Sequence, residues 1–225
     1  MDILLIAGLW LDGSAWTDVA AELEKLGHRP VPITLPGQGD GATAATLDDQ
    51  VAAVVAAVDA ASAPVLVVGH SAACTLAWLA ADARPGRVAR VALIGGFPAE
   101  DGKPYADFFA ITDDRMPFPG WGPFEGPDAA DLDGDTRRTI ASTAIAVPVG
   151  VARGVVRLTD ERRFDVPVAL VCPEFTPEQA RAWVDAGDLP ELARARHLDY
   201  VDIDSGHWPM FSRPTELARV LAALA

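Results

Sequence analysis

The stretch that decides the fold is VVGHSAA, residues 67–73. An uninterrupted apolar run precedes it, and a run of helix-forming residues follows it. This order predicts a buried strand, a sharp turn with Ser71 at its tip, and then a helix. The small residues Gly69 and Ala73 allow the strand and the helix to approach each other closely. The Ser71 hydroxyl is therefore expected to project from the carboxyl end of a parallel sheet.

A second informative stretch is YVDIDSGHWP, residues 200–209. A short β run ends in Ser-Gly, and a histidine and a proline-containing helix start follow. A serine hydroxyl is a weak nucleophile at neutral pH and needs a base, and imidazole is the usual one. The pattern makes His207 the candidate base for Ser71, with the two side chains within hydrogen-bond reach. His70, beside the serine, is expected to pack behind the site rather than to react.

Four landmarks in this order resemble the alpha/beta hydrolases, and they cover nearly the whole chain. Residues 3–16 resemble the first strand and oxyanion loop, and LPGQG (35–39) resembles the loop after the next strand. GHSAA (69–73) resembles the nucleophile elbow G-x-S-x-G, with alanine as its last residue. SGHWP (205–209) resembles the histidine loop. The resemblance is greatest to small-lidded esterases and hydroxynitrile lyases.

The fold class expected from these patterns is α/β: an alpha/beta hydrolase fold with a mostly parallel six-stranded sheet, flanking helices and an inserted lid. The apolar runs expected as strands are 3–7, 30–35, 64–69, 88–95, 166–172 and 197–203. The expected helices are 14–26, 46–61, 71–83, 176–186 and 213–224, with Thr46 as an N-cap. Residues 1–96 and 165–225 would form the core, and residues 97–164 would form the lid.

The predicted lid is rich in aromatic residues in its first half, and residues 135–158 are expected to form two helical pieces broken at 148–150. We interpret it as a hydrophobic cover over an acyl or alcohol pocket; the alternative is that its aromatics anchor an irregular loop to the core. Its aromatics include Phe108, Phe109, Phe118, Trp121 and Phe124. The candidate substrate-binding residues are Trp10, Phe108, Phe109, Trp121 and Trp208.

The resemblance also implies an oxyanion site and an orienting acid. The backbone N–H groups of Leu9 and Ala72 are the candidate oxyanion donors. Relatives carry an aspartate a few residues after the fifth strand, but in this chain that loop is short and Glu174 is its candidate acid. Glu100 or Asp101, after the fourth strand, is the second option. A Ser71–His207 dyad without an acid is the third.

Composition limits the classes of function. The formal net charge of −14 disfavours binding to nucleic acid and to anionic membranes, which depends on Lys and Arg. The two cysteines show no metal-ligand spacing, and no nucleotide-binding glycine motif is present, so neither a metal nor a cofactor is expected. Met1-Asp2 leads directly into the first apolar run without the features of a signal peptide, so a cytoplasmic location is expected. The sequence is compatible with a monomer and with a homodimer.

Three functions follow from this reading. The first is a serine hydrolase that cleaves a small-molecule carboxylic ester through an acyl-serine intermediate. The second is a hydroxynitrile lyase, which the resemblance makes less favourable, because such relatives carry a lysine after the histidine and a threonine in the oxyanion turn. Trp208 and Gly8 stand at those positions. The third is a non-catalytic ligand-binding homologue that has kept the pocket.

Overall fold

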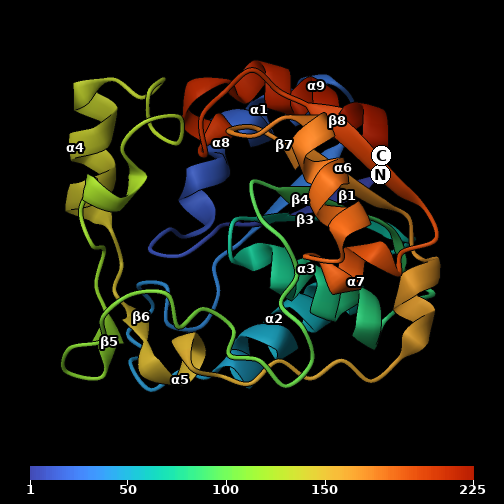
Figure 1. Cartoon of the computed structure of the whole chain (residues 1–225), viewed down its shortest axis with the longest axis horizontal. Helices are drawn as coiled ribbons and strands as arrows, with labels where there is room; N and C mark the ends of the chain where they lie inside the picture. The colour runs from blue at the N-terminus through green and yellow to red at the C-terminus, as the bar shows by residue number, and fades with distance from the viewer.

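A computed structural model describes the whole chain, residues 1–225 (Figure 1). Its centre is one sheet of six strands in the order β2-β1-β3-β4-β7-β8. The strands are β1 (Asp2–Ile6), β2 (Arg29–Ile33), β3 (Val65–His70), β4 (Val88–Ile94), β7 (Val168–Cys172) and β8 (Leu198–Asp202). Every pair of neighbours is parallel. The predicted fold class and the six-stranded sheet are therefore confirmed, and the sheet is parallel throughout.

The sheet is buried on both faces because its central strands β1, β3 and β4 are apolar at nearly every position. Successive side chains point to opposite faces of a strand. Leu4 and Ile6 of β1 accordingly join the core under one set of helices, and Ile3 and Leu5 join the core under the other. Covering helices on both sides are what a parallel sheet requires.

The helices are arranged as two layers around this sheet (Figure 1). α1 and α9 pack against each other on one face, and α2 and α3 pack against each other on the opposite face. The helices of these layers are α1 (Thr17–Lys25), α2 (Leu47–Ala60), α3 (Ala73–Ala83), α6 (Pro177–Ala186), α7 (Pro190–Ala193), α8 (Pro209–Ser212) and α9 (Pro214–Leu224), with the 3-10 turn η1 (Gly13–Trp16) before α1. None of the helices is both long and apolar enough to cross a membrane.

Local sequence signals set the helix starts. Thr46 caps α2 through a capping box with Asp49, in which each side chain accepts a hydrogen bond from the other residue's backbone N–H. Thr176 and Gln179 form the same motif at the start of α6, directly after the loop that carries Glu174. The second cap fixes where that loop ends and therefore how far Glu174 lies from the sheet.

Residues 97–164 contribute no strand to the six-stranded sheet, and residues 115–152 of this segment lie along the left and lower edges of the view in Figure 1. This segment contains β5 (Arg115–Met116), η2 (Gly122–Phe124), α4 (Gly134–Thr143), β6 (Val147–Pro148), α5 (Val149–Ala152) and η3 (Glu161–Asp165). The expectation of two helical pieces over 135–158 is only partly right. After α4 the chain extends at Ala144, and Val147 and Pro148 pair with β5 before α5 begins at Val149.

A cluster of buried charged side chains connects the end of this segment to the core. The Arg163 guanidinium on η3 forms ion pairs with Asp82 on α3 (3.3 Å) and with Glu191 on α7 (3.0 Å). Trp78 Nε1 donates a hydrogen bond of 2.8 Å to Glu191, and the backbone N–H of Thr159 donates to Asp82. Each of the three charged side chains is less than one tenth exposed. The cluster joins α3, the helix that follows Ser71, to the chain entering β7.

We predict that Arg163→Met lowers the free energy of unfolding by about 3–5 kcal/mol, because it leaves two buried carboxylates without their cation. The neighbouring Arg162→Met is the matched control. Arg162 pairs with Asp160, but its side chain is 74% exposed, so its loss should cost less than about 1 kcal/mol. Urea unfolding of both variants at pH 7 measures the difference. Equal effects of the two substitutions would contradict the assigned role of the cluster.

Candidate active site

Ser71 lies at the turn between β3 and α3 with a backbone φ of +56°, in the left-handed region that non-glycine residues rarely occupy. Its N–H donates a hydrogen bond of 2.8 Å to the carbonyl of Ile94 on the neighbouring strand. A Cβ at Gly69 would lie 2.3 Å from the carbonyl oxygen of Ala73, so only glycine allows this close approach. The strand and helix therefore hold Ser71 in a strained turn at the carboxyl edge of the sheet.

His207 and Glu174 come together from the loops after β8 and β7, which are neighbours in the sheet. His207 Nδ1 lies 2.7 Å from Glu174 Oε1, and the two side chains are 13% and 15% exposed. A carboxylate can only accept a hydrogen bond, so Nδ1 carries the proton. In the neutral ring Nε2 then keeps its lone pair and is able to accept a proton.

Two consecutive backbone N–H groups of the loop that carries His207 are also hydrogen-bonded. The His207 N–H donates to the carbonyl of Asp128 (2.7 Å), and the N–H of Gly206 donates to the Asp131 carboxylate (2.8 Å). Both aspartates belong to the inserted segment. These contacts leave no signal in the sequence, because the partners are more than 70 residues apart and no local pattern links them. The insertion thus fixes the loop that carries the candidate base.

The Asp128 carboxyl lies close to the same pair. Partial burial raises its pKa, the negative charge of Glu174 raises it further, and the neighbouring His207 lowers it. Two carboxyl groups, those of Glu174 and Asp128, therefore lie close to His207.

His70 is buried and supports His207 from behind. Its Nε2 lies 2.8 Å from the carbonyl oxygen of His207, so Nε2 must be the protonated nitrogen, and the two rings lie 4.9 Å apart. Burial first, and then the charge of His207, lowers the pKa of His70 to about 3. His70 is therefore a neutral hydrogen-bond donor at ordinary pH, in agreement with the expectation that it packs rather than reacts.

The two candidate oxyanion donors are free. Neither the N–H of Leu9 nor that of Ala72 donates to another group of the protein. Ala72 directly precedes α3, where the helix dipole favours negative charge. A Cβ at Gly8 would lie 3.0 Å from the Cβ of Ser71, so the backbone before Leu9 passes directly beside the serine.

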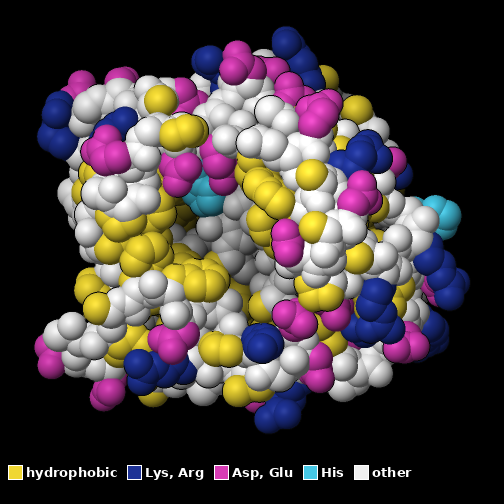
Figure 2. Space-filling model, in the orientation of Figure 1, with side chains coloured by type: hydrophobic (Ala, Val, Ile, Leu, Met, Phe, Trp, Pro, Cys, Tyr) yellow, Lys and Arg dark blue, Asp and Glu magenta, His cyan; other side chains and the backbone are white.

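A cavity of about 200 Å³ opens onto these residues. Figure 2 shows a hollow in this face, with apolar side chains along its walls and a histidine at its upper edge. The lining side chains are those of Leu9, Trp10, His70, Ser71, Phe108, Phe109, Phe124, His207 and Trp208. Ser71 and His207 thus face one cavity, although no hydrogen bond joins their side chains in this structure. Such bonds often tighten only in the complex with substrate.

Of the five aromatic residues predicted to bind substrate, four line this cavity and Trp121 does not. The Trp121 ring packs against Trp208 at 5.3 Å, and its Nε1 donates to the carbonyl of Arg137. It therefore lies in a layer behind the wall. Phe124, an aromatic of the predicted lid, takes the position at the wall.

The alternative acids lie elsewhere. Glu100 and Asp101 are both exposed, and the Asp101 carboxylate accepts a hydrogen bond of 2.9 Å from the N–H of Leu158. Only Glu174, among the three candidates, is hydrogen-bonded to His207. No group of three or more His, Cys, Asp or Glu side chains is arranged to hold a metal ion.

The comparison with known families agrees with this geometry. The model of the alpha/beta hydrolase family matches residues 3–220, which is almost the entire sequence. The chain belongs to the alpha/beta hydrolase family. The match spans all four landmarks of this hydrolase, from the strand before Leu9 to the loop of His207. No sequence match is found among curated proteins.

Solved structures share the fold of this hydrolase along its whole length. An extracellular alpha/beta-hydrolase from a Paenibacillus species, described as sharing structural and functional homology with Tobacco Salicylic Acid Binding Protein 2, has a TM-score of 0.81 at 17% identity, covering 99% of this chain and 98% of its own. A methylesterase from Arabidopsis has a TM-score of 0.72 at 14% identity, covering 100% and 98%. A pyrethroid hydrolase from Sphingobium faniae has a TM-score of 0.67 at 19% identity, covering 100% and 96%. At these identities the likeness shows the fold.

The neutral, buried state of His70 predicts a pH dependence of stability. An unfolded histidine titrates near pH 6.5, whereas the pKa of His70 in the folded protein is about 3. As the pH falls below 6.5 the unfolded chain binds a proton that the folded protein does not, so stability is lost between about pH 6.5 and pH 3. His70→Gln should reduce the loss of unfolding free energy between pH 7 and pH 5 by about 2 kcal/mol.

Urea unfolding at the two pH values measures this effect, and the glutamine amide is still able to donate to the His207 carbonyl. His197→Gln, which removes an exposed imidazole instead of a buried one, is the matched control. A His70→Gln protein that loses as much stability as the wild type would show that His70 takes up a proton in the folded state.

Proposed function

We propose that this hydrolase cleaves small, neutral carboxylic esters with Ser71 as its nucleophile. The observation that carries the proposal is the cavity that Ser71 shares with His207, whose Nδ1 is paired with Glu174 at 2.7 Å. This arrangement supports a serine, a base and an orienting acid acting in sequence. The free N–H groups of Leu9 and Ala72 support a site for the oxyanion.

In the first half of the proposed reaction, Ser71 Oγ attacks the ester carbonyl carbon while His207 Nε2 takes the hydroxyl proton. The negative charge moves to the carbonyl oxygen, where the N–H groups of Leu9 and Ala72 stabilise it. Glu174 stabilises the imidazolium that forms. The carbon–oxygen bond to the alcohol then breaks, and His207 gives its proton to the departing oxygen.

In the second half, a water molecule replaces the alcohol. His207 takes a proton from it, and the resulting hydroxide attacks the acyl-serine. Collapse of the second tetrahedral intermediate breaks the bond to Ser71 Oγ, which recovers its proton from His207. The acid is released and the enzyme returns to its starting state.

The lining of the cavity supports a neutral and apolar substrate. No Lys, Arg, Asp or Glu lines it. The residues that the inserted segment contributes to its wall are Phe108, Phe109 and Phe124. A charged substrate would lose its hydration there without gaining a partner. The methylesterase among the proteins of the same fold is named for a reaction on esters, in line with this proposal.

The lyase alternative finds no support in the same cavity. A lysine after the histidine, as in hydroxynitrile lyases, would place a cation beside the base. Here the Trp208 ring occupies that position, 4.8 Å from the His207 ring. Without a cation in the cavity, a cyanide leaving group would have no charge partner other than His207 itself.

We predict that Ser71→Ala lowers kcat/KM for p-nitrophenyl acetate by about 10⁴- to 10⁶-fold without loss of fold, because it removes the nucleophile. The measurement is steady-state hydrolysis with circular dichroism as the check on folding. Ser142→Ala, an exposed serine on α4, should retain the wild-type rate. A fluorophosphonate probe should label the wild type and not Ser71→Ala. A wild type that neither reacts with the probe nor hydrolyses esters would instead be a ligand-binding protein.

We predict that Glu174→Gln lowers kcat by up to about 10⁴-fold, because the amide no longer holds the Nδ1–H tautomer of His207 or stabilises the imidazolium. Glu100→Gln and Asp101→Asn are the controls, since both residues are exposed. Each should change kcat by less than about threefold. A loss of under tenfold in Glu174→Gln would mean that Ser71 and His207 work as a dyad, and a large loss in either control would relocate the acid.

A further inference from the structure

Trp10 lies where three cavities meet. It lines the cavity of Ser71, a groove of about 220 Å³, and a small cavity of about 20 Å³ behind the oxyanion loop. The groove and the Ser71 cavity have no other lining residue in common. The Trp10 residue is therefore the wall between them.

Several contacts hold this wall in place. The Trp10 ring lies 5.3 Å from those of Phe109 and Phe118, and its Nε1 donates a hydrogen bond of 3.1 Å to the carbonyl of Met116. Its carbonyl accepts a hydrogen bond of 2.9 Å from Ile145. Its backbone has a φ of +64°, which is unfavourable for a side chain of this size. A strained residue held by so many contacts indicates that the position of the indole serves the site.

The groove behind the wall lies between the core and α4 of the inserted segment. Its lining residues other than Trp10 and Leu11 are Asp12, at the start of η1, Ser14 and Ala15 of η1, Thr139, Ile140 and Thr143 of α4, Ile145, and Phe211 of α8. With Trp10 and Leu11 included, most of the lining residues are apolar, and the groove has about the volume of the Ser71 cavity itself. It is suited to an alkyl chain.

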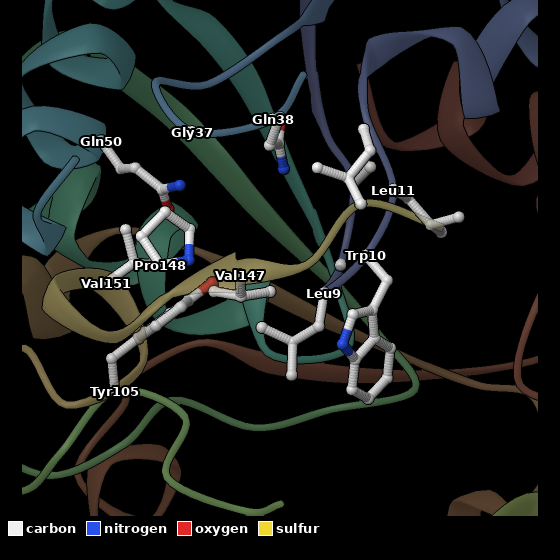
Figure 3. Close-up of a pocket in the computed structure, with 13 residues that line it drawn as sticks. Leu9, Trp10, Leu11, Gly37, Gln38, Gln50, Tyr105, Val147, Pro148 and Val151 are labelled. Carbon is white, nitrogen blue, oxygen red and sulfur yellow. The ribbon is translucent and has the colours of Figure 1, made fainter. Parts of the chain in front are cut away.

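The small cavity is a weaker candidate for substrate. Figure 3 shows it with Leu9 and Trp10 next to each other on one side and Gln50 and Tyr105 on the other. Its volume of about 20 Å³ has room for about one water molecule and not for an alkyl chain. Of the two spaces that adjoin Trp10 outside the Ser71 cavity, only the groove has room for additional length of substrate.

The acyl arm of the ester is the part that faces Trp10. His207 must give its proton to the alcohol oxygen, so the alcohol lies on the His207 side of the cavity. The carbonyl oxygen lies at the N–H of Leu9, directly before Trp10 in the chain. The acyl chain then extends towards the Trp10 wall.

We infer that Trp10 limits the hydrolase to short acyl groups by closing the Ser71 cavity off from the groove beside α4, which is a latent acyl subsite. This inference rests on the proposed function, since it concerns the substrate of the same serine. The wild type should prefer acetate and butyrate esters over longer ones. Without the indole, the two cavities become one, and a longer acyl chain is buried along Ile140 and Ile145.

The test is a series of p-nitrophenyl esters from acetate to decanoate with the wild type and Trp10→Gly. Glycine is chosen because it adopts the φ of +64° without strain. The ratio of kcat/KM for octanoate to that for acetate should rise at least about tenfold in Trp10→Gly. Should this variant fail to fold, Trp10→Phe, which removes one ring, should show a smaller shift in the same direction.

Two controls separate the groove from a general loosening of the site. Trp121→Ala removes an indole of the same aromatic cluster that lines neither cavity, and the ratio should stay at the wild-type value. Adding Thr143→Trp to Trp10→Gly fills the groove from α4 and should return the ratio towards the wild type.

The outcomes are distinct. A wild type that hydrolyses no ester overturns the proposed function, and the inference with it. An active wild type with an unchanged ratio in Trp10→Gly and Trp10→Phe overturns the inference alone. A shift that Thr143→Trp does not reverse overturns the assignment of the groove. A shift that appears only with longer alcohols of acetate esters, and not with longer acyl groups, overturns the assignment of the acyl arm.

Discussion

The hydrogen bonds of His207 are the constraint on which the candidate site depends. Its ring is held by Glu174, its N–H by the Asp128 carbonyl, and its carbonyl by His70. Three separate parts of the chain thus meet at one residue: the loop after β7, the inserted segment and the turn beside Ser71. An imidazole held in this way loses little further freedom when it accepts a proton, which is what preorganisation requires.

The same constraint explains why the neighbouring histidine is neutral. A protonated His70 would place a second positive charge 4.9 Å from the His207 ring in a buried site. The low pKa of His70 keeps it a neutral hydrogen-bond donor to the His207 carbonyl. The two neighbouring histidines therefore differ in role, because burial keeps His70 neutral whereas Nδ1 of His207 is paired with Glu174.

The parts of the fold that sequence could predict are those encoded by local patterns. The apolar run before Ser71 and the small residues around it predict the strand, turn and helix there. Thr46 predicts the start of α2, because it caps that helix. Contacts between distant segments leave no such pattern. The hydrogen bond from Gly206 to Asp131 is therefore not predictable from the sequence. The prediction that Trp121 lines the cavity is wrong because composition cannot distinguish the first layer of an aromatic cluster from the second.

The inserted segment completes the geometry of the candidate site in addition to lining the cavity. Asp128 and Asp131 hold the histidine loop, while Met116 and Ile145 hold Trp10 in the oxyanion loop. The segment therefore reaches both sides of Ser71, the side of the base and the side of the oxyanion. A motion that lifted it away as a whole would break these hydrogen bonds together. Substrate entry that preserves the site must involve a smaller part, such as the exposed Phe108 at the cavity, which unlike Phe109 and Phe124 packs against no other aromatic ring.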